Sequence, residues 1–560
     1  SGSTFSNVPG RTLYMTYGDG EDNSLVVSNG ASAYPWITSV GGLARTTNSN
    51  NPVVSARVLV TGTNSLLHGR DLTSGKNSGY EALYAEVVVS NGGTIQMTNN
   101  FVIGQSGLLD RQGLSPETLL VTGEGSRVET YNFRSAYADI VITNGGQVVV
   151  SNTADLNYRG APGDSSMLIT GTGSVFSNNG TLYMKAAGSF ASSTDGDVTI
   201  TVADGGKLQL GGILRMGTNN SNTATLNIGK FGENGMGGTV VSASDIYGES
   251  TNNVINFNQS NNMTFDAHIY SGPGITVNKL GTGTVTLIAG TNIAGVNSGI
   301  GIINVEQGAF IGDTRSLRGT ITNDAAVIFD QSTNGTYEGL MSGSGTLVKT
   351  GSGTLTLSGA NTHSGGTEVA AGALAGDTTS LQGAITNNSV VSFNQSTNGT
   401  YDTGVMSGSG ALLKTGAATL TLAGSKTYSG GTEVAAGTLA GDTTSLQGAI
   451  TNNAQINFVQ STNGTYSGVM SGSGSLVKQV ANTLTLNGAN TFSGTDPQAY
   501  LGNGLCDKAP SPATQWQGEN ISRFCMPEFD ALHAELTKTA DMAERQRIGR
   551  ELSAMMVDNG

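Results

Sequence analysis

The chain has 560 residues, of which 83 are glycine, 6% are aromatic and 12% are charged, and its formal net charge is −14. This length exceeds that of one compact globular domain. The acidic balance argues against a nucleic-acid partner, which needs basic residues to displace counterions. The sequence has no 18-residue apolar run that would predict a transmembrane helix. Because the first residues, SGSTFSNVPG, lack Met and a signal-peptide pattern, we expect a mature form or a fragment.

One varied phrase recurs between residues 20 and 230. A β-branched run is followed by a turn such as Asn-Gly or Asp-Gly and then by a second apolar alternation, which predicts strand, turn and strand. Successive phrases start at intervals of roughly 21 to 34 positions, so we expect stacked units. The phrases occupy 24–33, 58–67, 87–97, 119–129, 140–150, 167–177 and 200–210.

Two architectures could use these phrases: hairpins packed into a sandwich, or a β-solenoid in which each phrase pairs in parallel with the next rung. The spacing stays near one or two rungs, and almost no helical pattern before residue 495 could supply crossovers. Similar residues also recur at the same place in each phrase, so Asn/Thr and Val/Ile can stack in ladders. These features favour the solenoid.

The later repeats are longer and more regular. The heptapeptide QSTNGTY stands at 331–337, 395–401 and 460–466, and a GDT-type octapeptide stands at 312–319, 376–383 and 441–448. We expect each repeat unit to divide into about three rungs of roughly 21 residues each.

The segment GSGTLTLSGANTHSGGTEVAAGAL at 351–374 resembles the passenger-associated transport repeat of bacterial autotransporters. A second copy lies at 416–439, a partial one at 482–494 and a weak one at 281–292. The resemblance implies an all-β, right-handed parallel β-helix, irregular over 1–280 and repetitive over 281–494. It also implies a passenger, adhesin-like or structural, exposed on or released from the outer membrane of a Gram-negative bacterium. It further implies a partner, a C-terminal outer-membrane β-barrel, which we expect to be absent from this chain.

Residues that could carry chemistry are better explained by structure. His363 occupies a slot that holds Tyr428 and Phe492 in the later units, which indicates a stacking position, and we expect His68 in a charged surface loop. Recurring carboxylates suit Asx turns better than an active site, which is usually singular. Likewise, the Asn-x-Thr triplets fit Asn-Gly turns better than glycan attachment. The recurring positions are Asp313, Asp377 and Asp442, and Asn334, Asn398 and Asn463.

We therefore predict no enzyme and no catalytic, cofactor-binding or metal-ligating residues. The expected partners are host or matrix glycans or proteins, bound weakly and repeatedly by rows of Thr and Asn. A β-helical carbohydrate-active enzyme is the alternative, and it would need a singular cluster of acidic residues.

The tail, 495–560, has a different composition, poor in glycine and rich in charged residues. Pro527 opens a predicted helix with an apolar face, and Asp541 with Glu544 forms a predicted capping box for a second. Cys506 and Cys525 flank a loop that a disulfide could close. The apolar positions of the two helices are Phe529, Leu532 and Leu536, and Ile548, Leu552 and Met555.

The segments DPQAYL, FCMPEFDALHAEL and DMAERQRIGRELSAMM, with the Cys pair, resemble the C-terminal part of periplasmic peptide-binding proteins of ABC importers. Met526 stands where that family often has Asn, and the repeat text NTFSG replaces the family's ligand-binding Trp-x-x-Asp region. We therefore expect an incomplete helical fragment. Two explanations of the join at 494/495 stay open: a chimera, or a natural passenger with an unusual cap.

Overall fold

The computed structural model divides into two compact units, residues 1–373 and residues 374–560. Each unit is described by itself. The described residues are 4–6, 12–15, 23–40, 54–74, 83–104, 116–156, 163–184, 196–217, 223–230, 235–242, 245–250, 252–271, 274–288, 301–402, 404–491, 505, 526–539 and 542–559.

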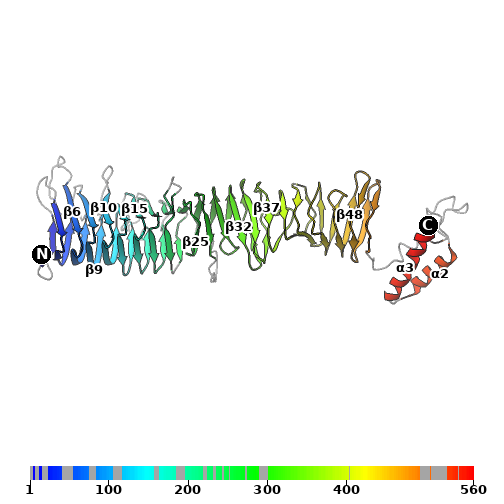
Figure 1. Cartoon of the computed structure of the whole chain (residues 1–560), viewed down its shortest axis with the longest axis horizontal. Helices are drawn as coiled ribbons and strands as arrows, with labels where there is room; N and C mark the ends of the chain where they lie inside the picture. The colour runs from blue at the N-terminus through cyan, green and yellow to red at the C-terminus, as the bar shows by residue number, and fades with distance from the viewer. Residues whose placement is uncertain are drawn as a thin grey trace. The chain divides into compact units, whose positions relative to one another are not determined.

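The first unit is built on a 13-stranded parallel sheet to which each predicted phrase contributes one strand (Figure 1). Val58 pairs with Val87, Val87 with Leu119, and Leu119 with Ile140, so like residues stack from rung to rung. The parallel β-helix is therefore confirmed. In spatial order its strands are β3 (Asn23–Ser28), β6 (Val54–Thr61), β8 (Leu83–Ser90), β10 (Glu117–Thr122), β12 (Ala138–Thr143), β15 (Ser165–Thr170), β18 (Val198–Ala203), β21 (Ala224–Ile228), β24 (Asn253–Phe257), β27 (Ile275–Lys279), β29 (Ile302–Val305), β31 (Thr320–Asn323) and β34 (Met341–Ser342).

A second sheet, of 16 strands, follows the same coil through the first unit. Its longer strands contain a bulge, and the register shifts between Gly69 and Asp71 and between Thr130 and Asn132. Its strands are β1 (Thr4–Ser6), β2 (Thr12–Met15), β4 (Ser32–Tyr34), β5 (Ile37–Val40), β7 (Leu66–Ser74), β9 (Thr94–Ile103), β11 (Arg127–Ser135), β13 (Gln147–Val150), β14 (Ala154–Leu156), β16 (Val175–Asn178), β17 (Leu182–Met184), β19 (Lys207–Leu210), β20 (Leu214–Met216), β22 (Thr239–Ser242), β23 (Ile246–Gly248) and β26 (Ile269–Ser271).

Two further groups of parallel strands complete the first unit. One is β25 (Met263–Phe265), β28 (Thr284–Leu287), β30 (Ala309–Gly312), β32 (Ala326–Asp330), β35 (Thr346–Thr350) and β37 (Thr367–Val369), and the other is β33 (Gly335–Tyr337) with β36 (Thr354–Leu357).

Two kinds of turn alternate along the 13-stranded sheet. In the first kind an Asn adopts the positive φ that the sequence predicts, 55° at Asn29 and 52° at Asn91. The second kind contributes a buried Ser whose Oγ accepts a hydrogen bond from the Gly of the preceding turn. These bonds, all 3.0 Å long, join Gly30 N to Ser65, Gly92 N to Ser126 and Gly145 N to Ser174.

Alternate residues of most strands are buried, which is the pattern of a strand with one face on a core. Inside the first unit the rings of Phe101 and Phe133 stack in adjacent rungs with 5.6 Å between their centroids, and the ring of Phe176 meets that of Phe133 edge-on at 5.8 Å. The predicted polar ladder is also present. Asn227, Asn256, Asn278 and Asn304 are joined by side-chain hydrogen bonds of 2.8 to 2.9 Å.

The second unit also contains parallel sheets. β38 (Ala373–Gly376) lies at the boundary of the units. The sheets are β39 (Ile385–Asn387) with β42 (Met406–Ser407); β40 (Val390–Asn394), β43 (Ala411–Thr415), β45 (Thr432–Val434), β47 (Ile450–Asn452) and β50 (Met470–Ser471); β41 (Gly399–Tyr401), β44 (Thr419–Leu422), β46 (Thr438–Gly441), β48 (Gln455–Val459) and β51 (Ser475–Gln479); and β49 (Gly464–Tyr466) with β52 (Leu484–Leu486).

The expected division of each copy into about three rungs of roughly 21 residues slightly overestimates the length of a turn. Thr346 pairs with Ala326 and Ser475 with Gln455, so a turn of the coil is shorter than a third of a copy. Each copy therefore covers three full turns of the coil and then one additional strand, so the next copy starts in the neighbouring sheet. As a result, β40 and its counterpart β48 in the next copy lie in different sheets of the second unit, as β29 and β37 do in the first.

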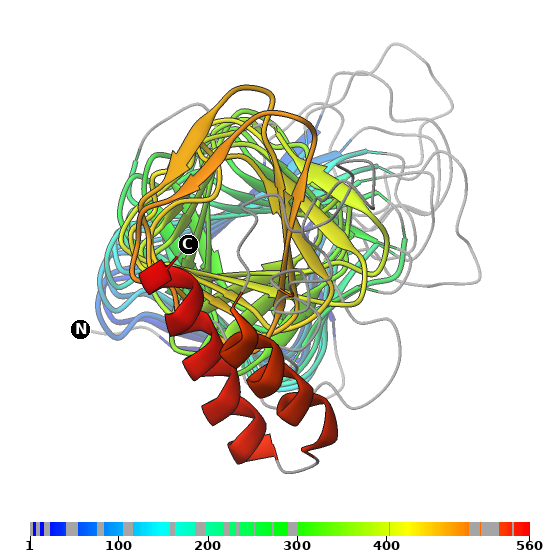
Figure 2. The same cartoon turned by 90° about the vertical axis from the view of Figure 1, so that its right-hand side faces the viewer.

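The tail contains the two predicted helices, α2 (Pro527–Lys538) and α3 (Met542–Asn559), which lie side by side (Figure 2). Arg545 Nη1 donates to the carbonyls of Leu536 and Thr539 at the end of α2, as expected for a cation at a helix C-terminus. No helix among the described residues combines the length and apolarity needed to cross a membrane. The predicted apolar faces meet in a small core of Phe529, Leu536, Ile548 and Leu552, with Leu532 and Met555 against it.

Candidate functional site

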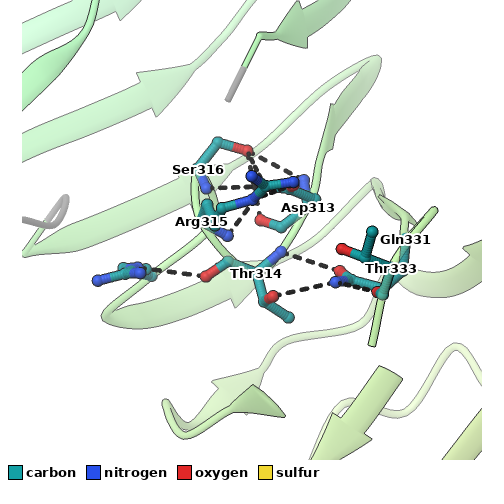
Figure 3. A network of polar contacts seen from close by, with 7 residues as sticks. Asp313, Thr314, Arg315, Ser316, Gln331 and Thr333 are labelled. Carbon is teal, nitrogen blue, oxygen red and sulfur yellow. Dashed lines mark hydrogen bonds and ion pairs between the residues drawn. The ribbon is translucent and has the colours of Figure 1, made fainter. Parts of the chain in front are cut away.

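The recurring polar residues form a network between rungs, shown for one copy in Figure 3. Asp313 Oδ1 accepts hydrogen bonds from the backbone N–H groups of Arg315 (2.9 Å) and Ser316 (3.1 Å). This is the predicted Asx turn, and Asp377 and Asp442 repeat it. Burial acts to raise the pKa of these last two carboxyls, but the hydrogen bonds they accept outweigh it, so their pKa lies below the usual value.

The first residue of QSTNGTY holds this loop. Gln331 Oε1 accepts from the backbone N–H of Thr314 at 3.0 Å, while its Nε2 donates to Thr314 Oγ1 and to the carbonyl of Thr333 (Figure 3). Gln395 and Gln460 make the same contacts in their copies. The hydrogen-bonding groups of this buried amide are therefore satisfied, and the Gln ties the loop at Thr314 to its own strand end.

The rest of the heptapeptide fixes the rungs on either side. Asn334 Oδ1 accepts from the backbone N–H of Thr354, 20 positions later, at 2.9 Å. The buried Tyr337 donates its hydroxyl proton to the carbonyl of Gly319, the last residue of the octapeptide. The Asn residues therefore bridge rungs. The predicted Asn-Gly turn is wrong here, because Gly335 begins β33 and adopts no positive φ. Asn398 and Asn463, and Tyr401 and Tyr466, repeat these bonds.

A buried lysine closes a corner in each of the first two transport-repeat copies. Lys349 Nζ donates to the carbonyls of Thr350, Gly351 and Ala371, and Lys414 has the equivalent three acceptors. Burial lowers the pKa of both ammonium groups. Lys279 lies in a similar corner and donates to the carbonyl of Gly281, and burial lowers its pKa to about 8.

His363 and Tyr428 occupy the same slot, as predicted. His363 Nε2 lies 3.0 Å from Thr367 Oγ1, and the Tyr428 hydroxyl lies 2.6 Å from Thr432 Oγ1. Both side chains are buried, which lowers the pKa of His363 and raises that of Tyr428 to about 12. In both copies an uncharged aromatic side chain bonded to a buried Thr therefore contributes to the packing of the rungs.

Two carboxylates of the first unit are buried and singular. Glu117 Oε2 accepts hydrogen bonds from Ser74 Oγ and from the backbone N–H of Gly104, both 2.9 Å long. Burial raises the pKa of Asp155 to about 7, although the charge of Arg134, its neighbour in the adjacent strand, acts to lower it. The described residues contain no group of three or more His, Cys, Asp or Glu side chains that could hold a metal ion.

The expected surface loop at His68 is wrong. The segment belongs to β7 of the 16-stranded sheet, which has a register shift between Gly69 and Asp71. A bulge of this kind interrupts the strand pattern, so in the sequence Gly69 and the charged residues after it resemble a turn. Beside it stand exposed aromatic side chains that sequence reasoning missed: Tyr34 and Trp36 are 40% exposed and Tyr131 is 49% exposed. The available signal was the outward position of Tyr34 in strand alternation. Trp36 lies in the bend after β4 and Tyr131 at a bulge, so alternation gave no signal for them.

Cys506 and Cys525, predicted as a possible disulfide, lie outside the described residues, and so do Phe492 and Asp541.

The family model of the passenger-associated transport repeat matches residues 347–375, 412–440 and 476–496. The two full copies and the partial copy are thereby confirmed, while the weak copy predicted at 281–292 lies outside the matched residues. The chain is also 26% identical over 360 residues to the uncharacterized protein YuaQ of Escherichia coli (strain K12), an alignment covering 60% of this chain and 24% of that protein. The chain thus spans about a quarter of this relative's length.

These comparisons agree with the geometry. The matched repeats coincide with the rungs closed by Lys349 and Lys414, on a parallel β-helix. The chain carries the repeats that are characteristic of autotransporter passenger domains, which indicates an autotransporter passenger and implies a surface-exposed or secreted location in a Gram-negative bacterium.

Proposed function

We propose that this chain is a non-enzymatic rod that attaches a bacterial surface to glycans or proteins of a host or matrix. The use of the recurring polar residues supports this proposal. The Gln, Asp, Tyr and Lys side chains of the copies bond within the stack, so their recurrence serves the rod rather than a reaction.

The outward side chains supply the contact surface. Each copy places one Thr beside another in the next rung: Thr336 pairs with Thr356, Thr400 with Thr421, and Thr465 with Thr485. Thr336, Thr400 and Thr465 are exposed. Identical hydroxyl pairs repeated along a rod suit weak contacts that gain strength through multivalency.

The test is attachment of beads coated with the full chain to surfaces bearing matrix proteins or neutral and acidic glycans. We expect attachment above that of albumin-coated beads on at least one surface. A chain lacking residues 376–440, one whole copy, is the matched variant and should attach more weakly without losing attachment.

Two results would contradict the proposal. Attachment no stronger than that of albumin on every surface would remove the adhesive role. The purified chain is also incubated with soluble polysaccharides, whose length is measured by size-exclusion chromatography. If the polysaccharides become shorter, the non-enzymatic role is wrong and a carbohydrate-active enzyme is favoured.

A further inference from the structure

The exposed aromatic side chains of the described residues gather in one part of the 16-stranded sheet. Large apolar side chains are exposed at several places in the described chain, but those that carry rings are Tyr34, Trp36 and Tyr131. All three belong to the first rungs of the first unit, in or beside β4 and β11. An exposed group of rings at a single place differs from the isolated exposed aliphatic residues expected on any surface.

Register places the rings in two adjacent rows that run from rung to rung. In one row the Tyr34 ring lies beside that of His68, His68 pairs with Gln96, and Gln96 pairs with Glu129. In the other, the carbonyl of Trp36 accepts from the backbone N–H of Arg70, and the bulges that follow hold Asn99 and then Tyr131. Rungs are spaced by about 4.8 Å, so Trp36 and Tyr131, three rungs apart, are separated by about 14 Å along the coil. That is the length of a short oligosaccharide.

The polar side chains between the rings are held in place. Arg70 lies over the Trp36 ring at 5.7 Å, and the ring centroids of Tyr34 and His68 are 5.9 Å apart. His68 Nδ1 lies 2.9 Å from Gln96 Oε1, and Gln96 Nε2 donates to Glu129 Oε2 at 2.9 Å. Planar side chains fixed by such contacts lose little entropy when a ligand binds.

Charge decides which ligand fits. Arg70 is paired with Asp71 at 3.5 Å and Arg127 with Glu129 at 2.5 Å, so each guanidinium of this surface has a carboxylate beside it. A polyanion would meet two carboxylates as well as two guanidinium groups and would gain little. A neutral sugar instead offers C–H faces for the rings and hydroxyls for the amides and charged pairs.

We propose that this surface, the aromatic ridge of Tyr34, Trp36, Arg70 and Tyr131, binds a linear neutral oligosaccharide lying along the coil. The inference rests on the proposed attachment function and names the ligand class for one part of it. Trp36 and Tyr131 stack on sugar rings at the two ends, while Arg70, Gln96 and Asn99 bond to hydroxyls between them.

The test uses the intrinsic fluorescence of Trp36 in the full chain. The chain has two Trp residues, so W516F leaves Trp36 as the single reporter. Neutral hexasaccharides of glucose, galactose, mannose and N-acetylglucosamine are titrated, with heparin hexasaccharide as the acidic comparator. We expect a saturable change with at least one neutral probe and none with heparin.

Variants locate the site by calorimetry with the neutral probe that binds. W36A and Y131A should each weaken binding at least tenfold, and W36F should retain most of it because the stacking face remains. M236A, at a side chain that is 58% exposed elsewhere in the first unit, is the matched control and should bind as the parent does. Unchanged circular dichroism and melting temperature of W36A show that the fold is retained.

Three outcomes would overturn the inference: no saturable change with any neutral probe, binding of heparin alone, or equal binding by W36A and the parent. Bead attachment separates this failure from that of the proposed function. If the W36A/Y131A double variant attaches as the parent does, to a glycan or to a protein surface, the ridge is not the binding site and the attachment role stands.

Discussion

The rungs before residue 280 and the copies after residue 300 use their polar side chains differently. In the first region Asn256 bonds to Asn227 and Asn278, equivalent residues one rung away in each direction. In the copies Gln395 bonds to Thr378, a different residue of the same copy, 17 positions earlier. Like therefore stacks on like where each phrase forms one rung, whereas a copy carries its own bonds between rungs.

The difference shows how such a chain can lengthen. A whole copy can be inserted by duplication, because its Gln, Asn and Tyr side chains bond to partners within the same copy. The irregular rungs depend on the identity of their neighbours, so they change one at a time. Singular surface features such as the aromatic ridge accordingly lie among the irregular rungs.

The largest expected effect is the loss of a buried ring from a copy. Tyr401→Ala removes a side chain that is 1% exposed and whose hydroxyl bonds to the carbonyl of Gly383. We expect a loss of about 3–5 kcal/mol in unfolding free energy, the range for large aromatic truncations in cores. Hydrogen exchange over residues 385–422 measures it locally. Thr400→Ala, at an exposed neighbour, is the control, and equal protection in the two variants would contradict the self-contained copy.

A smaller effect is expected in the Asn ladder. Asn256→Ala breaks its bonds to Asn227 and Asn278, and the neighbouring amides lose a partner, Asn227 at a buried and Asn278 at a partly buried position. The expected loss is about 1–3 kcal/mol, measured by urea unfolding. In a double-mutant cycle with Asn278→Ala the two losses should not add, because the variants share a bond. Strict additivity would show that the ladder carries no coupling.

The Lys279 corner should make stability depend on alkaline pH. The folded-state pKa of this group is about 8, below its ordinary value of 10.5. The unfolded chain therefore binds more protons between these values, so stability rises as pH increases through this window and falls as pH is lowered through it. Urea unfolding of the parent and of Lys279→Met is measured at pH 7.5 and at pH 9.5. The unfolding free energy of the parent, relative to that of the variant, should be larger at pH 9.5 than at pH 7.5. No shift would contradict a depressed pKa.

The smallest effect is expected at the Asx turns. The pKa values of Asp377 and Asp442 are depressed in the folded state, so their contribution is present above the unfolded pKa of about 3.9 and is lost as pH falls through the lower folded values. Melting temperatures of the parent and of the D377N/D442N variant should differ at pH 6 and converge toward pH 2. A difference that is constant with pH would show that the charge of the carboxylates is unimportant.

The sequence by itself determined the local elements. Val and Ile runs ending in Asn-Gly gave strands and turns, and the apolar spacing of Phe529, Leu532 and Leu536 gave a helix face, because these preferences act over a few residues. The recurrence of phrases was enough to predict parallel stacking, and the recurrence of Asp313 in three copies was enough to predict an Asx turn. Each of these depends on contacts within one rung or between identical neighbours.

Only the tertiary structure decided the register of the coil and what that register brings together. The length of a turn is a sum over strands, corners and bulges, so the repeat length alone could not reveal the extra side that moves β48 into another sheet than β40. The bulge at Gly69 likewise hides a strand in a segment that reads as a loop. Trp36 and Tyr131 are far apart in the sequence, and only stacked rungs place them on one surface, because each turn of the coil returns the chain to the same side.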